Sequence, residues 1–415
     1  MASAASITVP ARTRSYAFGV LILLTLANGV VAFDRLLVAY LSPFIVADLK
    51  ISNTQLGLLA AALSGAVALT SVLGGRLADR TGRRKMILIA CTLAFTIGSA
   101  AGGFAMTFAA LFAARFMLGL FEGPMIPISQ TVMAQTSPPE RRGLAMGFMQ
   151  MVGAFGIAGV LGPIVATRMA QDYGWQNTLF LSLMPGLLLA LGIALVLRPD
   201  SPTPKAEAQP RASLSTALGE LLRIRNMRAA LAIAALITAW LVLQNTFLGV
   251  FLTQTKGLSP ATAGSVIAMG GFAGIIGGIG LPWLSDRIGR RPVMIGAALA
   301  GSLCPIALLL LPADPLLLGA AILIGWIPLG IAPLYCGTIP TESVSPALAS
   351  TAVGLTMGAA ELFGGVILPP LAGFVADGFG LGSVFVICAG LAVAAAGAAL
   401  LLRETAPCII GTEEN

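Results

Sequence analysis

Five charged side chains lie within stretches of sequence that are otherwise apolar. They are Asp34, Arg35, Arg115, Glu122 and Glu361. Arginine stays charged in almost any protein environment, and its planar guanidinium group suits a carboxylate. A carboxylate in a partly dry cavity takes up a proton more readily, whereas an arginine beside it favours the ionised form. These residue types therefore predict a site that binds an anion and exchanges protons.

The chain has no histidine, which excludes histidine proton relays and imidazole metal ligands. Any proton carrier within the apolar stretches is therefore a carboxylate. Arg115 and Glu122 are seven residues apart, which places both on one face of a helix, about 10.5 Å from each other. A ligand with one carboxylate fits between or near them. We expect no metal site and no cofactor.

The sequence VAFDRLLVAY places Asp34 next to Arg35. One interpretation is a coupling device, because capture of an anion by Arg35 would remove part of the stabilisation of ionised Asp34 and favour its protonation. The other interpretation is a static structural pair. Neighbours on a helix point about 100° apart and pair poorly with each other, which counts against the static pair.

The composition indicates elements built for a bilayer. Of 415 residues, 57% are hydrophobic and only 10% are charged, which is far too little charge for a soluble protein of this length. Apolar runs of about 20 residues, each long enough to cross a hydrocarbon core, recur along the chain. We therefore predict an all-α membrane protein with twelve transmembrane helices. The runs cover about residues 16–42, 52–75, 84–106, 107–130, 143–168, 175–197, 228–252, 260–284, 291–311, 315–338, 347–373 and 379–402.

The net charge of +7 comes from basic residues that are distributed unevenly among the connections between these runs. Lysine and arginine gather at the termini and in alternate connections, whereas the opposite connections are nearly free of them. The positive-inside rule then predicts that both termini and the long central loop are cytoplasmic, in a cell (inner) membrane. The basic charge reflects this membrane topology, so we predict a lipid bilayer and no nucleic acid as partner.

Two connections resemble each other: GRLADRTGRRK, residues 75–85, and LPWLSDRIGRRP, residues 281–292. Their shared residues are separated by 207 positions. The same offset relates Gly57 to Gly264, Gly123 to Gly330, Gly147 to Gly354 and Pro163 to Pro370. A constant offset of half the chain predicts two six-helix bundles in parallel repeat, residues 1–197 and 228–415, joined by a cytoplasmic loop over 198–227.

The pattern GxxxDRxGRRK resembles the signature of the major facilitator superfamily. That resemblance implies two bundles in pseudo-twofold repeat and alternating access to a site between them. It also implies a gating role for the loops, here Asp79 and Arg83 in the first copy and Asp286 and Arg290 in the second. Asp79 is expected to face the N-terminus of the eleventh helix, near Ala347, where a carboxylate stabilises the helix dipole. The second copy has Pro282 in place of the leading glycine.

The segment RFMLGLFEGPMIP, together with Asp34-Arg35, resembles the organic anion:cation symporters within that superfamily. The matching positions in the fourth helix are Arg115, Leu118, Gly119, Glu122 and Pro124. The resemblance implies that Asp34 and Glu122 exchange protons while the arginines bind the anion. Ser64–Val67 lacks the aromatic residues common in sugar-acid carriers. A mono- or dicarboxylate with an apolar or aromatic body is therefore expected.

Several uncharged polar residues are candidates to orient the anion. They are Gln150, Gln244, Asn245 and Tyr335. Each is equally suited to a hydrogen bond between helices. Glu361 has no counterpart in the family motif, and it is either a second proton site or a structural partner.

The residues predict proton-coupled symport of a small organic anion by a monomer. The alternative is a proton-driven exporter of drugs or cations, because GAFGIAGVLGP partly resembles the fifth helix of antiporters. Two intramembrane arginines count against a cationic substrate. An enzyme is not expected, since neither HExxH nor GxSxG occurs.

Overall fold

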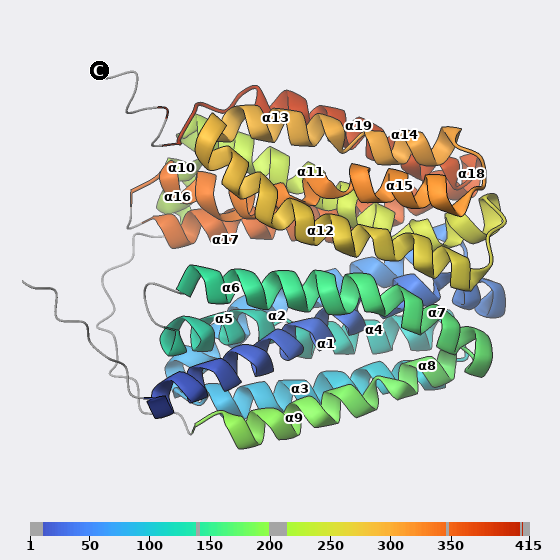
Figure 1. The fold of residues 1–415 in the computed structure, drawn as a ribbon, viewed down its shortest axis with the longest axis horizontal. Helices are drawn as coiled ribbons and strands as arrows, with labels where there is room; N and C mark the ends of the chain where they lie inside the picture. The colour runs from blue at the N-terminus through green and yellow to red at the C-terminus, as the bar shows by residue number, and fades with distance from the viewer. Residues whose placement is uncertain (1–10, 138–141, 199–213, 346–347, 407–408, 410–415) are drawn as a thin grey trace, which may run out of the picture.

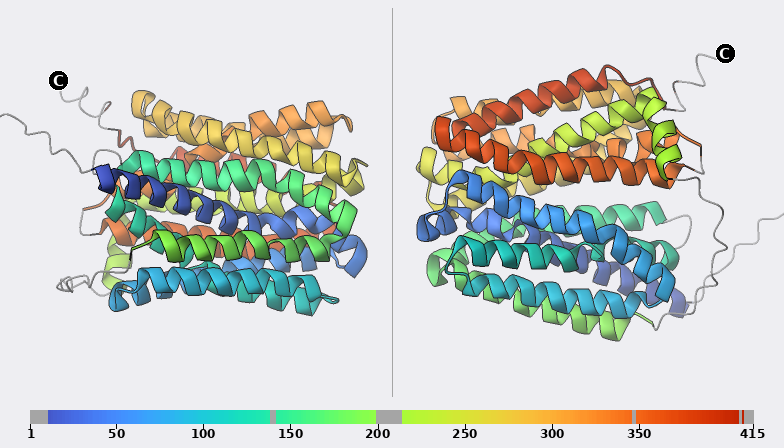
Figure 2. Two further views of the ribbon diagram at one scale, coloured as in Figure 1. Left: turned by 60° about the horizontal axis from the view of Figure 1, so that its bottom comes forward. Right: turned by 180° about the vertical axis from the view of Figure 1, so that it is seen from behind.

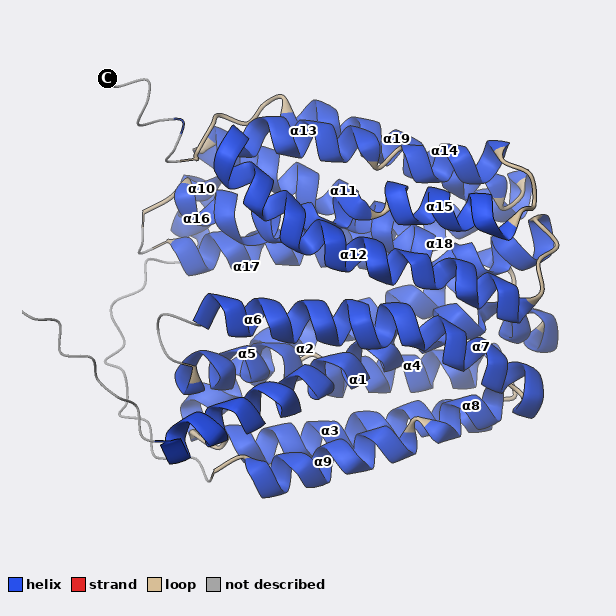
Figure 3. Cartoon of the chain, in the orientation of Figure 1, coloured by secondary structure: helices blue, strands red, loops and turns tan. Residues whose placement is uncertain are grey.

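The computed structural model describes residues 11–137, 142–198, 214–345, 348–406 and 409. The described residues form helices joined by short connections and include no strand (Figure 3). Twelve helical stretches are long and apolar enough to cross a membrane. The predicted fold class, an all-α protein with twelve membrane spans, is confirmed.

The first six spans are built from α1 to α9, several of them in two or three consecutive segments. Their bounds are α1 (Ala11–Leu49), α2 (Asn53–Thr81), α3 (Arg84–Ala101) with η1 (Gly102–Phe104), α4 (Phe108–Glu122) with α5 (Met125–Thr136), α6 (Arg142–Gln150) with η3 (Met151–Leu161) and α7 (Gly162–Tyr173), and α8 (Trp175–Leu181) with α9 (Leu183–Val196).

The last six spans follow a short helix, α10 (Leu214–Arg223). Their bounds are α11 (Arg225–Val250) with η4 (Phe251–Thr255), α12 (Pro260–Ile288), α13 (Arg290–Ala300) with α14 (Leu303–Leu310), α15 (Pro315–Gly325) with η5 (Ile327–Ile331), η6 (Leu334–Thr338) and α16 (Ile339–Glu342), α17 (Ala349–Ala359) with η7 (Ala360–Ile367) and α18 (Leu368–Phe379), and α19 (Gly382–Ala399).

The spans form two bundles that lie side by side, α1 to α9 in one half and α11 to α19 in the other (Figure 1). The right-hand view of Figure 2 shows the same division from behind. The terminal end is the end at which α1 begins and α19 finishes, and the far end is the opposite one. The halves touch mainly through α2 against η7 and α18, α12 against η3 and α7, and α1 against α11.

Close packing at the far end depends on glycines that the internal repeat relates to each other. A Cβ atom on Gly57 of α2 would overlap the backbone of Pro369 and Pro370 in α18. In the second half, a Cβ on Gly264 of α12 would overlap the carbonyl oxygen of Pro163 in α7. The residues with the constant sequence offset thus form two equivalent contacts across the interface, where small residues let helix backbones approach.

The terminal end is packed differently. Gly147 of α6 and Gly354 of α17 are also related by the repeat, yet a Cβ on either would meet nothing within 4 Å. Both helices make their main contacts within their own halves. The two halves are therefore held together around their middle and at the far end.

One side chain joins the halves at the far end by capping a helix. Asp377 of α18 accepts hydrogen bonds from the backbone N–H groups of Asn53, at 2.8 Å, and Thr54, at 3.0 Å, and from the Thr54 hydroxyl at 2.6 Å. Asn53 and Thr54 begin α2 in the other half. A carboxylate at a helix N-terminus is stabilised by the unpaired N–H groups and the helix dipole.

The cavity-facing helices of the two halves share a local irregularity. η3 and η7 have wide π-type turns and occupy equivalent places in the repeat. Each is followed closely by proline, Pro163 after η3 and Pro369 after η7. Proline has no N–H to donate and its ring crowds the preceding turn, so a widened turn before it has a physical cause.

The outer surface is apolar, as a bilayer requires. Large hydrophobic side chains such as Leu195, Leu310 and Phe379 are 76%, 79% and 85% exposed. A soluble monomer rarely exposes so much contiguous apolar surface. Each of these three exposed side chains belongs to one of the twelve predicted spans.

Candidate functional site

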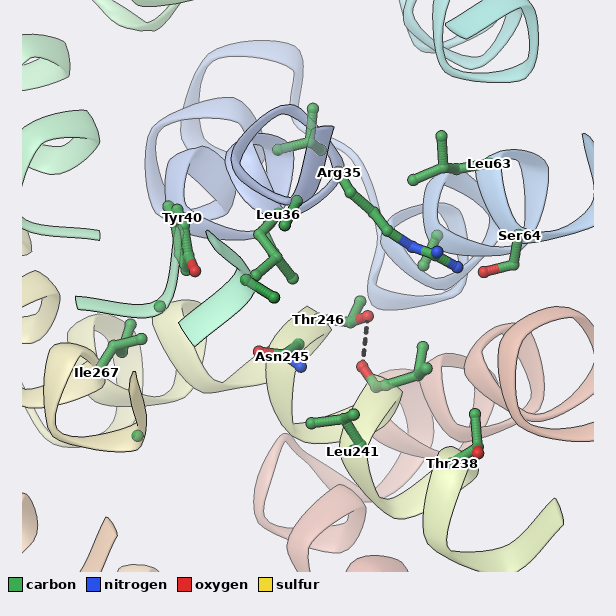
Figure 4. A pocket seen from close by; sticks show the side chains of 18 of the residues that line it. Arg35, Leu36, Tyr40, Leu63, Ser64, Thr238, Leu241, Asn245, Thr246 and Ile267 are labelled. Carbon is green, nitrogen blue, oxygen red and sulfur yellow. Dashed lines mark hydrogen bonds between the residues drawn. The ribbon is translucent and has the colours of Figure 1, made fainter. Parts of the chain in front are cut away.

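A cavity of about 330 Å³ lies between the two halves, which is large enough for a small-molecule ligand. Residues of α1, α2 and η3 line it from one half, and residues of α11, α12 and η7 from the other. Most of the lining is apolar. Figure 4 shows Arg35 and Ser64 on the side of the first half, across from Thr238, Leu241 and Asn245 of α11.

Arg35 of α1 enters this cavity and binds carboxylates of both halves. Its Nη2 donates to the two oxygens of Glu361 at 3.1 and 3.2 Å, and Glu361 belongs to η7. Its Nη1 lies 3.8 Å from Oε1 of Glu122 in α4. The side chains of Arg35 and Glu361 are 26% and 29% exposed, whereas that of Glu122 is 1% exposed. The ion pair between Arg35 and Glu361 therefore joins the halves within the cavity.

Asp34 points into the interior of the first half. Its Oδ1 accepts a hydrogen bond of 2.9 Å from Ser99 of α3, and Ser99 in turn accepts one of 2.9 Å from Ser182. Its Oδ2 has no hydrogen-bond partner among the described residues. The carboxylate of Asp34 and the guanidinium group of Arg35 thus diverge, because adjacent residues on a helix face directions about 100° apart.

Arg115 of α4 is buried and binds the backbone of α1. Its Nη1 donates to the carbonyl oxygen of Asp34 at 3.0 Å, and its Nη2 donates to that of Arg35 at 2.7 Å. Its Nε has no partner within the described chain. Arg115 borders the cavity, but its two terminal nitrogens fix the helix turn that carries the charged pair. Arg115 therefore holds the turn of α1 that carries Arg35.

The charges at this level of the membrane do not balance. Arg35 and Arg115 are two cations, whereas Asp34, Glu122 and Glu361 are three carboxylates. Neither oxygen of Glu122 accepts a hydrogen bond from a described residue. A buried ionised carboxylate without hydrogen bonds is costly in free energy. No group of three or more Cys, Asp or Glu side chains in the described part of the chain is placed to hold a metal ion.

The four uncharged candidates differ in position, and only one of them lines the cavity. Asn245 lines the cavity. Gln244 is fully buried in the second half, where its Oε1 accepts hydrogen bonds from Cys304 and from the Trp326 indole. Tyr335 is buried among helices of the second half, and Gln150 is exposed at the end of α6. Neither Tyr335 nor Gln150 is among the cavity-lining residues, and Gln244 is absent from them too.

Three aromatic residues that the sequence analysis did not single out line the cavity. They are Tyr40 of α1, Phe155 of η3 and Trp326 at the end of α15. The hydroxyl group of Tyr40 donates to the carbonyl oxygen of Ala158, at 3.0 Å. An aromatic residue within an apolar run gives no sequence signal of whether it faces a cavity or a neighbouring helix.

The gating candidates all lie at the terminal end. Asp79 is in the last turns of α2 and Arg83 directly precedes α3. Ala347, near which Asp79 was expected to lie, falls outside the described residues, as does the side chain of Asp79.

The second copy of the motif forms a network within its own half. Arg290 forms hydrogen bonds with Asp286, with Ser285 at 2.7 Å and with Glu342 of α16 at 3.0 Å. The carboxylate of Glu404, beyond α19, caps the start of α13. Asp286 and Arg290 therefore stabilise the terminal end of the second half in this conformation.

Comparison with known proteins gives a consistent family. The family model of the Major Facilitator Superfamily matches residues 24–362 and, in a second match, 283–410. The hexuronate transporter of Bacillus subtilis is 26% identical over 392 residues, which is 90% of this chain and 92% of that protein. The cis,cis-muconate transport protein of Acinetobacter baylyi is 24% identical, over 85% of this chain and 86% of that protein.

Other relatives match in part. Polyol transporter 5 of Arabidopsis thaliana is 28% identical over 194 residues, and the match covers 46% of this chain but only 35% of that protein. Among solved structures, a mutant of the nucleoside transporter NupG is similar with a TM-score of 0.78 at 18% identity, over 94% of this chain and 100% of that chain. A D-xylose–proton symporter is similar with a TM-score of 0.73 at 16% identity, over 94% and 99%. The chain belongs to the major facilitator superfamily, whose members are secondary transporters rather than enzymes.

Proposed function

We propose that this transporter moves a small organic anion together with a proton. The observation that carries the proposal is the position of Arg35, a cation with about a quarter of its side chain exposed, in the cavity between the two halves. A guanidinium group binds a carboxylate with two parallel hydrogen bonds. A charge within the membrane is costly unless it has a partner or a function, so an anion site explains why an arginine lies there.

The rest of the cavity favours an anion with an apolar body. The rings of Tyr40, Phe155 and Trp326 contribute to a lining that is mostly aliphatic, and Asn245 and Ser64 add polar groups. Small-molecule sites commonly combine an apolar wall with a few polar groups that fix orientation. We propose a mono- or dicarboxylate with an apolar or aromatic body.

The carboxylates around Arg35 support coupling to protons. Binding of an anion would add a fourth negative charge beside Asp34, Glu122 and Glu361, with two arginines to balance them. Protonation of at least one carboxylate removes that repulsion. We propose that Asp34 and Glu122, the residues implied by the resemblance to anion symporters, carry protons through the transport cycle.

The distribution of basic residues supports an orientation with both termini in the cytoplasm of a cell membrane. In the first half, four basic residues lie at the terminal end, where α2 ends and α3 begins: Arg80, Arg83, Arg84 and Lys85. In that orientation the structure is closed towards the outside. We propose that the transporter works as a monomer in the lipid bilayer, without nucleic acid.

The test is uptake into proteoliposomes with an imposed pH gradient, acidic on the outside. Benzoate, cis,cis-muconate and D-glucuronate are the probes, because they differ in ring character, charge and hydroxylation. We expect benzoate or muconate to accumulate in these liposomes. Liposomes whose pH gradient has been abolished with an uncoupler should accumulate neither anion. Arg35→Gln should abolish uptake, and Arg198→Gln is the control, since Arg198 stacks on Tyr16 and is neither a cavity-lining residue nor a gating candidate. Uptake of none of the three anions, or full uptake by Arg35→Gln, would contradict the proposal.

The excess of carboxylates over arginines around the cavity also favours the alternative function, a proton-driven exporter of drugs or cations. The same liposomes separate the two functions. An exporter of this kind would move ethidium against its gradient when the proton gradient is reversed, and the anions would not compete. Ethidium transport without anion uptake would replace the proposed function with this one.

A further inference from the structure

We infer that Glu361 is an internal ligand which the transported carboxylate displaces from Arg35, and that the displaced Glu361 then takes up the proton. The inference rests on the proposed function and adds to the proposed proton carriers, Asp34 and Glu122, a third carboxylate that responds directly to anion binding. It also assigns a role to a residue with no counterpart in the motifs of the sequence.

The geometry singles out Glu361 among the three carboxylates. It lines the cavity, and it is 29% exposed, whereas Asp34 and Glu122 are 1% exposed and are absent from the lining. Both of its oxygens lie within hydrogen-bond distance of one nitrogen of Arg35, at 3.1 and 3.2 Å. Glu361 therefore occupies the guanidinium edge that an incoming carboxylate needs.

The position of Arg35 leaves an anion little alternative. The backbone of its turn is fixed by Arg115, and its Nη1 faces the buried Glu122. A ligand that enters through the cavity meets the side of Arg35 at which Glu361 is bound. Two carboxylates on the same nitrogen repel each other, so the ligand and ionised Glu361 bind in competition.

The charge count explains why displacement brings a proton. With all five groups ionised, the two arginines and three carboxylates have a net charge of −1. A monocarboxylate would make the charge −2, and one proton on Glu361 returns it to −1. Once Glu361 has lost Arg35, the other titratable groups that face it are Glu122 of α4 and Tyr335 and Cys336 of η6, none of which is a cation. Displacement from Arg35 therefore leaves Glu361 without a cationic partner among the described titratable groups that face it.

The exchange would also loosen the contact between the halves. Arg35 belongs to α1 and Glu361 to η7, so their ion pair crosses the interface. Replacing Glu361 by a freely moving anion removes a charged link between the bundles while the site is occupied. The two halves would then move relative to each other more readily when the anion occupies the site.

The experiment measures equilibrium binding of benzoate to the purified full-length protein in nanodiscs, by calorimetry between about pH 5 and about pH 8. In wild type, affinity should fall by up to about tenfold per pH unit once Glu361 is ionised, with uptake of one proton per benzoate. In Glu361→Gln, affinity at the highest pH should be about tenfold higher or more, and it should depend on pH less steeply than in wild type.

Two further variants make the result specific. Glu361→Asp restores a carboxylate and should restore pH dependence and proton uptake. Glu122→Gln tests the other carboxylate that faces Arg35: loss of pH-dependent binding in this variant, with pH dependence kept in Glu361→Gln, would assign the proton to Glu122 instead. Each variant is first checked for a monodisperse profile and for cooperative thermal unfolding.

The outcomes distinguish this inference from the proposed function. If wild type neither binds benzoate nor transports any of the three probe anions, the proposed function is wrong and this inference is wrong with it. If wild type binds benzoate but Glu361→Gln loses binding or keeps the wild-type pH dependence, only the role of Glu361 is wrong. A folded Glu361→Asp without pH dependence would likewise overturn it.

Discussion

Arg115 and Arg35 lie at the same level of the membrane, yet their guanidinium groups have different partners. Arg35 binds side-chain carboxylates, while Arg115 binds two backbone carbonyl oxygens of α1. Both arginines sit among apolar helices, so the sequence alone makes them equivalent. Their different contacts predict different mutant behaviour.

Replacing Arg115 should lower stability as well as transport. Arg115→Ala removes two charge-assisted hydrogen bonds and leaves a buried space, so we expect a loss of about 2 kcal/mol or more in stability. Arg115→Lys keeps the charge but lacks the fork that reaches two carbonyl groups at once, so it should restore stability only in part. Thermal unfolding in detergent measures both. Wild-type stability of Arg115→Ala would show that the contacts with α1 are unimportant.

Replacing Asp34 should separate exchange from accumulation. Asp34→Asn keeps an acceptor for the Ser99 hydroxyl, and it resembles a carboxyl that is permanently protonated. If Asp34 carries protons through the cycle, counterflow of a labelled anion should continue, whereas uphill uptake driven by a pH gradient should be lost. Both are measured in the same liposomes. Undiminished uphill uptake would remove Asp34 from the proton pathway.

At the scale of elements, the contact of α18 with the start of α2 closes the far end. Asp377→Asn weakens a charge–dipole contact worth about 0.3–1 kcal/mol and one or more of its three hydrogen bonds. We expect the far end to open about two- to tenfold more often. A cysteine at Leu56 of α2, which lines the cavity, reports this as faster labelling by an impermeant thiol reagent from that side.

Asp314→Asn is the matched control for Asp377→Asn. Asp314 also caps a helix N-terminus, but it caps α15 within its own half through the N–H groups of Leu316 and Leu317. Its replacement should leave the labelling rate at Leu56→Cys unchanged. Equal rates in both variants would show that the cap on α2 has no part in closure.

The segment after α19 stabilises the second half through Glu404. Burial would raise the pKa of Glu404, but backbone N–H donors from Ala406, Arg290, Arg291 and Thr405 outweigh it, so the pKa lies below its ordinary value. A carboxyl with a lowered folded pKa stabilises the protein above the unfolded pKa, and that contribution is lost as the pH falls through the folded value.

Glu404→Gln should therefore destabilise the protein at neutral pH and matter less in acid. We expect a cost of about 1 kcal/mol at about pH 7, from weaker hydrogen bonds to the start of α13. The difference in melting temperature between wild type and variant should shrink towards about pH 4 and below, near the ordinary pKa of glutamate. A difference that stays constant with pH would contradict the assigned ionised state.

At the scale of the whole molecule, closure at the far end predicts that a disulfide there would trap the protein in this conformation. In a background without the five native cysteines, the pair Thr54→Cys and Asp377→Cys should form a disulfide on oxidation, because these residues touch. The crosslinked protein should not transport, since alternating access requires that end to open. The pair Gly147→Cys and Gly354→Cys at the terminal end should not crosslink without ligand. Transport by the crosslinked Thr54 and Asp377 variant would rule out opening at this point.

The sequence by itself determined the elements and their repeat. Twelve apolar runs specify twelve spans because only helices satisfy their own backbone hydrogen bonds within lipid. The offset of 207 residues identified Gly57, Gly264, Pro163 and Pro370 before their contacts were known, because close helix packing needs small residues at fixed places. The charged residues of the site were also visible, since a charge in an apolar run is expensive and stands out.

Only the tertiary structure decided which of those residues face each other. Arg35 and Glu361 are 326 residues apart, and no periodicity links them; the packing of α1 against the second half brings them together. The adjacent Gln244 and Asn245 differ in the same way, one buried between helices and one in the cavity, because helix rotation is set by neighbouring helices. Hydropathy specifies that a helix crosses the membrane, but side-chain direction and partner depend on how the two bundles meet.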